Sequence, residues 1–154
     1  MELFTWAALA QDPMWYARRA SLRETFEAAF ASFDVASSSN ETAGVTYGPW
    51  YVLGPFDNAE GRGFDTPHPP EKSVDLAADA EGAGGRKIRW RRMDAFKDGQ
   101  PNSLMLFDKN ESVCAYVTRA IDAPCAMRLP SEFGSDDALT VWLNGERLLS
   151  KKVD

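Results

Sequence analysis

The sequence predicts a mainly β fold, an antiparallel jelly-roll-type β-sandwich preceded by an α-helical segment. Short apolar runs recur between residues 50 and 149, and turn-forming residues separate most of them. Such spacing is typical of antiparallel sandwiches. Before these runs, apolar residues follow one another at three- and four-residue spacing, which indicates a helix. The 154 residues are 44% hydrophobic and 26% charged, which suits one domain with a well-buried core.

The helical segment is predicted to start at Asp12-Pro13, because Asp accepts bonds from first-turn amides and Pro tolerates the first helical position. A packing face follows within residues 14–33, formed by Trp15, Leu22, Phe26, Ala29, Phe30 and Phe33. Residues 1–10 are interpreted as a helix end of a longer protein. The predicted organisation is a helical segment over 1–33, a polar linker over 34–46 and a sandwich module over 47–154.

The predicted strands are short and mostly bounded by Gly, Pro, Asn, Asp or Ser. They cover residues 50–53, 87–93, 103–107, 112–118, 125–129, 139–143 and 146–149. The first of them is apolar on both faces, so something must cover its outer side, and the helix over residues 14–33 is the expected cover. The glycines at 82, 84 and 85 lack the Lys-Ser or Lys-Thr of a phosphate loop and are expected to mark a hairpin.

The net charge and the lengths of the apolar runs argue against nucleic-acid binding and membrane insertion. The net charge is -6, which disfavours binding through phosphate neutralisation, so no nucleic-acid partner is expected. The basic run over residues 86–92 alternates, so we expect Ile88 and Trp90 to point inward while Arg89 and Arg91 meet solvent. No stretch approaches the ~20 apolar residues that a membrane span needs, and no membrane insertion is predicted.

Cys114 and Cys125 fall on neighbouring predicted strands joined by a short turn. A directly opposed pair is awkward there, so two buried thiols are favoured over a disulfide. The loop over residues 54–72 is either a structural flap or a ligand-binding loop. His68, the single histidine, lies in it between two prolines in an apparently exposed segment, which disfavours a catalytic triad and His-rich zinc chemistry.

Asp136 and Asp137 are adjacent in a polar turn, where both carboxylates could approach one hard cation such as calcium. The alternative is that Ser135 and Asp136 simply cap the turn. The strand over residues 139–143 follows and ends in an Asn144-Gly145 hairpin signal. If its odd-numbered residues face the core, Trp142 points outward as a stacking platform for a sugar, although packing beneath the 54–72 flap is an equal alternative.

Two motifs carry a family resemblance: Ser135 to Arg147, and Gly48-Pro49-Trp50-Tyr51-Val52-Leu53-Gly54-Pro55-Phe56-Asp57-Asn58. They resemble the galactose-binding-like β-sandwich modules of large multidomain proteins from planctomycetes and related bacteria, which are similar to the sugar-binding domain of family 2 glycoside hydrolases. The resemblance covers roughly the last two thirds of the chain. The family has Gly where this chain has Ala138. The Asp-Asp turn also resembles the calcium site of adhesin-type lectin domains.

The resemblance implies a noncatalytic carbohydrate-binding or domain-organising module of a larger extracellular or periplasmic protein. Its partners would be carbohydrate or the neighbouring domains. The candidate cation ligands are Asp136, Asp137 and Asn144, and the candidate sugar-binding residues are Trp142 and Asn144. The alternatives are a purely structural spacer or protein-interaction domain, and a glycoside hydrolase fragment. Because the resembling modules continue with further strands, the chain is also expected to be C-terminally incomplete, with an unfinished sheet that favours association.

Overall fold

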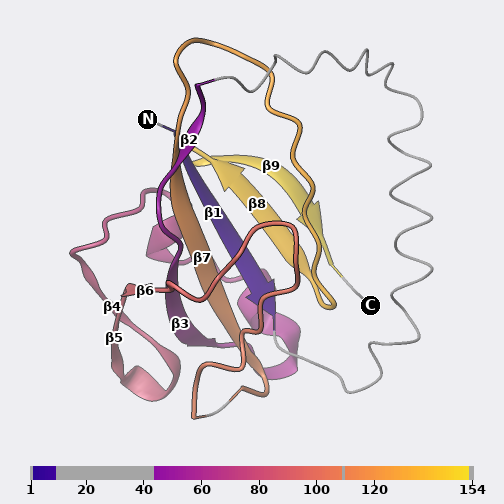
Figure 1. Ribbon diagram of the computed structural model, residues 1–154. Coiled ribbons are helices and arrows are strands. Elements are labelled where there is room, and N and C mark those ends of the chain that lie inside the picture. The colour runs from indigo at the N-terminus through magenta and orange to yellow at the C-terminus, as the bar shows by residue number, and fades with distance from the viewer. Residues whose placement is uncertain (1, 10–43, 109, 153–154) are drawn as a thin grey trace.

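The computed structural model describes residues 2–9, 44–108 and 110–152. The predicted helix over residues 14–33, and the part of the predicted linker before residue 44, lie outside the described residues. The chain as described is mainly β, in antiparallel sheets, as predicted (Figure 1). Short 3₁₀ helices are found in its loops.

A seven-stranded sheet forms the body of the described structure. Its order is β6-β3-β7-β1-β8-β9, and β2 pairs with β7 beside this path. The ten-residue strand β7 pairs with β1, β2 and β3. The strands of this sheet are β1 (Glu2–Leu9), β2 (Thr46–Tyr47), β3 (Tyr51–Asp57), β6 (Arg91–Arg92), β7 (Val113–Asp122), β8 (Leu139–Leu143) and β9 (Glu146–Lys151). A small hairpin of β4 (Asp79–Glu81) and β5 (Lys87–Arg89) stands beside it (Figure 1).

The N-terminal segment corrects one prediction, because β1 is a strand and not a helix end. It pairs antiparallel with β7 on one side and with β8 on the other. A short apolar run bounded by polar residues fits a buried strand as well as a helix segment, and periodicity alone does not separate the two. A strand hydrogen-bonded on both edges suits such a run.

Two predicted strands are wrong. Residues 103–107 and 125–129 pair with no strand in the described part of the chain. In the first segment the alternation was real, because Leu104 and Leu106 pack on the sheet whereas Met105 is 62% exposed. These residues cover a face of the sheet instead of extending its edge. The second segment lies between Pro124 and Pro130, neither of which can donate a ladder hydrogen bond.

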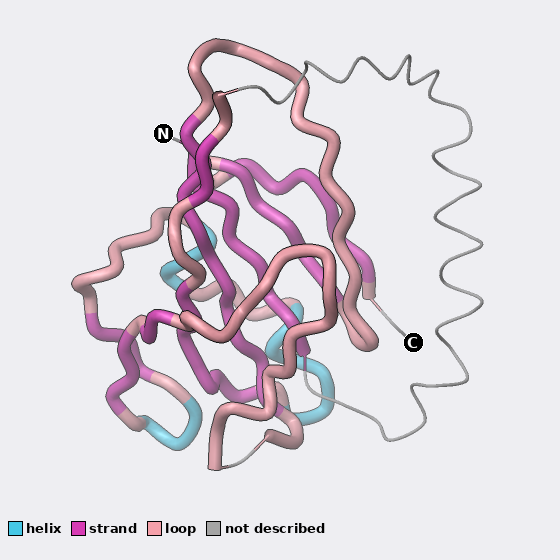
Figure 2. Tube along the Cα trace, viewed as in Figure 1, coloured by secondary structure: helices cyan, strands magenta, loops and turns pink. Residues whose placement is uncertain are grey.

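The sheet buries apolar side chains on both faces. One, here called the Tyr116 face, carries Leu53, Phe56, Cys114, Tyr116 and Trp142 and is covered by Phe64, Ala80, Ile88 and Trp90. The opposite face, here called the Val117 face, carries Val52, Ala115 and Val117. A loop crosses this second face (Figure 2) and covers it with Met93, Phe96, Leu104, Leu106 and Phe107. The sequence predicted that a helix covers the outer side of β3. In the part of the chain that the structure describes, this loop covers it.

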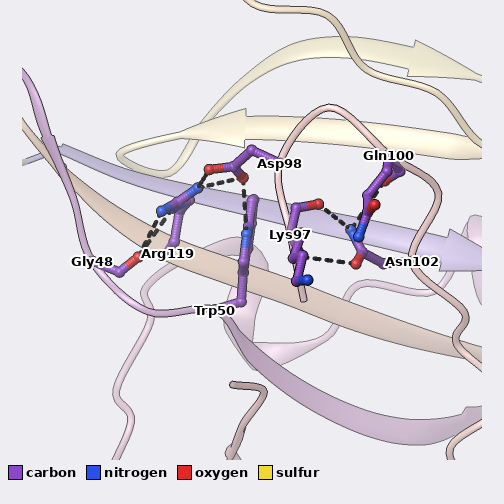
Figure 3. Close-up of polar contacts among 7 residues, drawn as sticks. All are labelled: Gly48, Trp50, Lys97, Asp98, Gln100, Asn102 and Arg119. Atoms are coloured by element: carbon purple, nitrogen blue, oxygen red, sulfur yellow. Dashed lines mark hydrogen bonds and ion pairs between the residues drawn. The ribbon is translucent and has the colours of Figure 1, made fainter. Parts of the chain in front are cut away.

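The loop over residues 93–112 is fastened to the sheet through Arg119 of β7 (Figure 3). The Arg119 guanidinium donates to both carboxylate oxygens of Asp98 at 2.6 and 2.8 Å, and to the Gly48 carbonyl at 2.8 and 3.2 Å. The Arg119 guanidinium carbon also lies 4.5 Å from the centre of the Trp50 ring and 4.8 Å from that of Tyr47. Trp50 Nε1 donates to the same Asp98 at 3.1 Å. These five residues join β7, β2, the entry to β3 and the covering loop.

The β4–β5 hairpin confirms the reading of the basic run. Ile88 and Trp90 pack on the Tyr116 face, whereas Arg89 and Arg91 are exposed. Asp79 accepts from Arg89 and Lys87, and these bonds lower its pKa to about 2. The basic run is therefore partly paired within its own hairpin.

The cysteines do not pair. Cys114 is buried in β7, and burial raises the pKa of its thiol to about 12. Cys125 is exposed in a loop, so the prediction of two buried thiols is right for Cys114 alone. None of the helices in the described ranges has the length and apolar character needed to cross a membrane.

Candidate functional site

A pocket of about 310 Å³ opens where the loop after β3 meets the β4–β5 hairpin. The loop contributes two 3₁₀ helices, η1 (Ala59–Phe64) and η2 (Pro69–Glu71). The polar residues that line the pocket are Asp57, Arg62, Thr66, His68 and Glu81, together with Phe56, Ala59, Gly63 and Gly82. The 54–72 loop, which the sequence left open between flap and ligand-binding loop, thus forms one wall of a cavity and also covers the sheet through Phe64.

His68 is the least exposed of the polar residues that line the pocket. It is half-buried and not exposed as predicted, because its ring packs against Phe56 with centroids 4.3 Å apart. Its Nε2 atom is buried and makes no hydrogen bond to any described residue. Burial lowers the pKa of His68, while the nearby Glu71 carboxylate acts in the opposite direction. At neutral pH the pocket wall therefore carries an uncharged imidazole.

Glu71 anchors the loop to the sheet beneath the pocket. Its Oε1 atom accepts from the Tyr116 hydroxyl at 2.5 Å and from the His68 backbone amide at 3.2 Å. Burial and the bond to Glu71 raise the pKa of Tyr116, so its hydroxyl stays protonated and keeps donating. Because Tyr116 is a core residue of β7, these bonds fix η2 and His68 on the sheet.

The lowered pKa of His68 predicts a loss of stability on mild acidification. The unfolded chain takes up the histidine proton near pH 6.5, whereas the folded chain does so at lower pH. The contribution of His68 is thus fully present above pH 6.5 and falls as the pH decreases through the folded-state pKa. We expect the free energy of unfolding, measured by chemical denaturation, to fall between pH 7 and pH 5.5. The His68→Gln variant should show a flatter profile, and equal slopes for the two proteins would contradict the prediction.

The residues chosen from the sequence fall in three separate places. Trp142 is 8% exposed and packs against Tyr116 with ring centroids 6.1 Å apart, so it lies in the core and offers no open platform. Asn144 and Gly145 form the predicted hairpin turn, with φ of 52° and 82°, between β8 and β9. Both residues adopt the left-handed conformation that a type I′ turn requires.

Asp136 and Asp137 lie at a bend before β8. Ser135 Oγ accepts from the Asp137 backbone amide at 3.3 Å, which is the turn-capping arrangement kept as the alternative. Asn144 is at the other end of β8, and the strand itself extends about 13 Å. The structure therefore does not bring Asn144 to the aspartates, and within the described ranges it gathers no three His, Cys, Asp or Glu side chains into a metal-binding group.

The calcium hypothesis consequently rests on Asp136 and Asp137 alone, whereas Ca²⁺ takes six to eight oxygen ligands. Its test is thermal denaturation with and without millimolar calcium. A rise in melting temperature that Asp136→Asn abolishes supports a site at this turn. An unchanged melting temperature would exclude a calcium site at Asp136 and Asp137.

The pocket residues were not selected from the sequence, although the loop that carries several of them was. Asp57 and Arg62 lie within or just after the 48–58 motif, but nothing in their local spacing brings Glu81 to them. That neighbour comes from the β4–β5 hairpin, whose first strand has only three residues and was not predicted. A sequence signal existed in the two glycines on either side of the pocket, Gly63 and Gly82, each of which permits its wall to approach the backbone of β3 closely.

No protein-family model matches this chain, and no curated protein or solved structure matches it either. The chemistry of the site is therefore argued from its own groups. Carboxylates, a guanidinium and a neutral imidazole can together accept and donate hydrogen bonds to a small polar ligand.

Proposed function

We propose that this chain is a noncatalytic carbohydrate-binding module of a larger extracellular or periplasmic protein, with its sugar site in the pocket between the 57–68 loop and the β4–β5 hairpin. The observation that carries the proposal is this polar pocket, about 310 Å³ in volume, into which Arg62, His68, Asp57 and Glu81 bring hydrogen-bonding groups. That volume is at the lower end for small-ligand sites. It fits a single sugar unit better than an extended chain.

Sugar hydroxyls both donate and accept hydrogen bonds, so a site for them needs both kinds of partner. Asp57 and Glu81 accept, whereas Arg62 donates. Its ion pair with Glu60, at 3.2 Å between highly exposed side chains, is weak enough to rearrange around a ligand. His68 lines the same pocket, but its Nε2 atom is buried, so the ligand contacts are assigned to Asp57, Glu81 and Arg62.

The proposal places the sugar away from Trp142, whose ring is buried in the core. It retains the resemblance to galactose-binding-like modules and the jelly-roll sandwich as the proposed fold. A glycoside hydrolase would need a carboxyl held protonated near neutral pH as its general acid. Asp79, beside the pocket, has the opposite character, because two basic neighbours keep it ionised.

The main alternative is a domain-organising spacer that binds no sugar. Glycan-array binding followed by calorimetry separates the two. We expect the unmutated chain to bind glycan saturably. The Arg62→Ala variant should bind about tenfold more weakly, because it loses a charged hydrogen-bond donor. Arg128→Ala is the matched control, because Arg128 is exposed in a loop and does not line the pocket. Absence of any saturable glycan response would favour the spacer.

A further inference from the structure

The pocket carries an excess of negative charge. Asp57 comes from the end of β3 and Glu81 from the end of β4, and both are exposed at the opening. Arg62 is the one cation among the described residues that line the pocket, and its guanidinium already pairs with Glu60. The lining thus holds two carboxylates against one guanidinium, and that guanidinium is paired with a third carboxylate, Glu60, outside the lining.

The remaining titratable group of the wall does not offset this excess. Burial against Phe56 keeps His68 uncharged at neutral pH, as the direction of its pKa shift indicates. The groups that face the His68 ring from the sheet are also uncharged, namely Phe56 and the Tyr116 ring, whose centroid is 5.8 Å away. The nearest charge is that of Glu71, which is a further carboxylate.

We propose that this pocket selects a glycan unit bearing a primary amine, such as a hexosamine without its N-acetyl group. The inference rests on the proposed carbohydrate-binding function and names its ligand class. An ammonium group has three donors and no acceptor, which complements Asp57 and Glu81. The sugar hydroxyls would then accept from Arg62.

The backbone of both pocket walls is held close to β3, which fixes the positions from which the Asp57 and Glu81 side chains extend. A Cβ atom at Gly63 would lie 2.6 Å from the Asp57 carbonyl oxygen, and one at Gly82 would lie 2.6 Å from the Pro55 carbonyl oxygen. Both walls therefore pack directly against the backbone of β3. Asn58 Oδ1 also accepts from the Gly63 amide at 2.9 Å and closes the η1 turn. Such pre-organisation favours discrimination between ligands that differ in one group.

The experiment compares three oligosaccharides of equal length and linkage that differ only at C2, carrying an amine, an acetamido group or a hydroxyl. Titration calorimetry at pH 6, where the amine is protonated, gives the affinity of each. We expect the amine form to bind about tenfold more tightly than the hydroxyl form, the gain of a charge-assisted hydrogen bond. Glu81→Gln and Asp57→Asn should each reduce this ratio severalfold. Glu146→Gln is the control, because Glu146 is an exposed acid on β9 and its replacement removes one negative charge, as Glu81→Gln and Asp57→Asn do.

The outcomes separate this inference from the proposed function. Equal affinity for the three sugars, or preference for the acetamido or hydroxyl form, overturns the amine inference and leaves sugar binding in place. A ratio that falls as much in Glu146→Gln as in Glu81→Gln also overturns it, because the preference then reflects net charge and not the pocket. If none of the three binds and a glycan array is negative as well, the proposed function fails together with the inference.

Discussion

Replacement of Trp142 by alanine is expected to lower the free energy of unfolding by about 3 to 5 kcal/mol, the range for large aromatic-to-alanine changes in a core. Trp142 is 8% exposed and lies in the cluster of the Tyr116 face with Leu53, Phe56 and Tyr116. Removing the indole leaves a cavity in the middle of this cluster, which the paired strands around it cannot fill by moving. Urea or guanidinium denaturation of the variant and the parent measures the difference.

Leu148→Ala provides the contrast on the neighbouring strand. Leu148 is 53% exposed on β9, where the register with β8 shifts, so its truncation should change stability by no more than about 0.5 kcal/mol. Trp142→Phe should fall between the two, since it keeps most of the apolar volume. A Trp142→Ala protein as stable as the parent would contradict the core assignment and restore the exposed platform that alternation along β8 had suggested.

Along β8, alternation predicted which residues share a face, but it did not predict that both faces are buried. Along β8, Leu139 and Val141 are buried as expected, but Thr140 and Trp142 are buried as well. The inference assumed one wet face, which holds for many antiparallel sheets. Here loops and the β4–β5 hairpin cover the two faces, and nothing local to residues 139–143 reveals a cover that comes from residues 64, 88 and 90. The Asn144-Gly145 turn was predictable because its conformational requirement is local.

The pocket was predictable only in part for the same reason. The prolines of the loop over residues 54–72 indicated a constrained backbone, and ligand binding was one of the two roles considered for this loop. Its burial of His68 depends on Phe56 and on the Tyr116–Glu71 hydrogen bond, which joins residues 45 apart in the sequence. Contacts of that separation leave no trace in periodicity. The Arg119–Asp98 contact was missed likewise, because neither residue is unusual in its own segment.

The Arg119–Asp98 ion pair is unusual in how its two members are exposed. The Arg119 side chain is 10% exposed and that of Asp98 is 62% exposed. Its two-oxygen geometry and the Trp50 and Tyr47 rings hold the guanidinium in one orientation, which a Lys in its place could not reproduce. Water can rehydrate the exposed Asp98 if Arg119 is lost, whereas the Gly48 carbonyl, on a half-buried residue, loses both of its hydrogen bonds from Arg119. Most of the stability lost with Arg119 is therefore expected to come from its hydrogen bonds to Gly48 and not from those to Asp98.

Arg119→Met is accordingly expected to lower the free energy of unfolding by about 2 to 3 kcal/mol, less than a fully buried pair because Asp98 regains solvent. The covering loop over residues 93–112 should loosen first, so limited proteolysis should cut it faster in the variant than in the parent. Asp98→Asn is the matched change, because it keeps an oxygen for Arg119 and removes only the charge, and it should cost less than Arg119→Met. A double-mutant cycle between the two positions then gives their coupling energy. Unchanged proteolysis of residues 93–112 in Arg119→Met, together with zero coupling, would show that the apolar contacts of Phe96, Leu104 and Leu106 hold the loop without this ion pair.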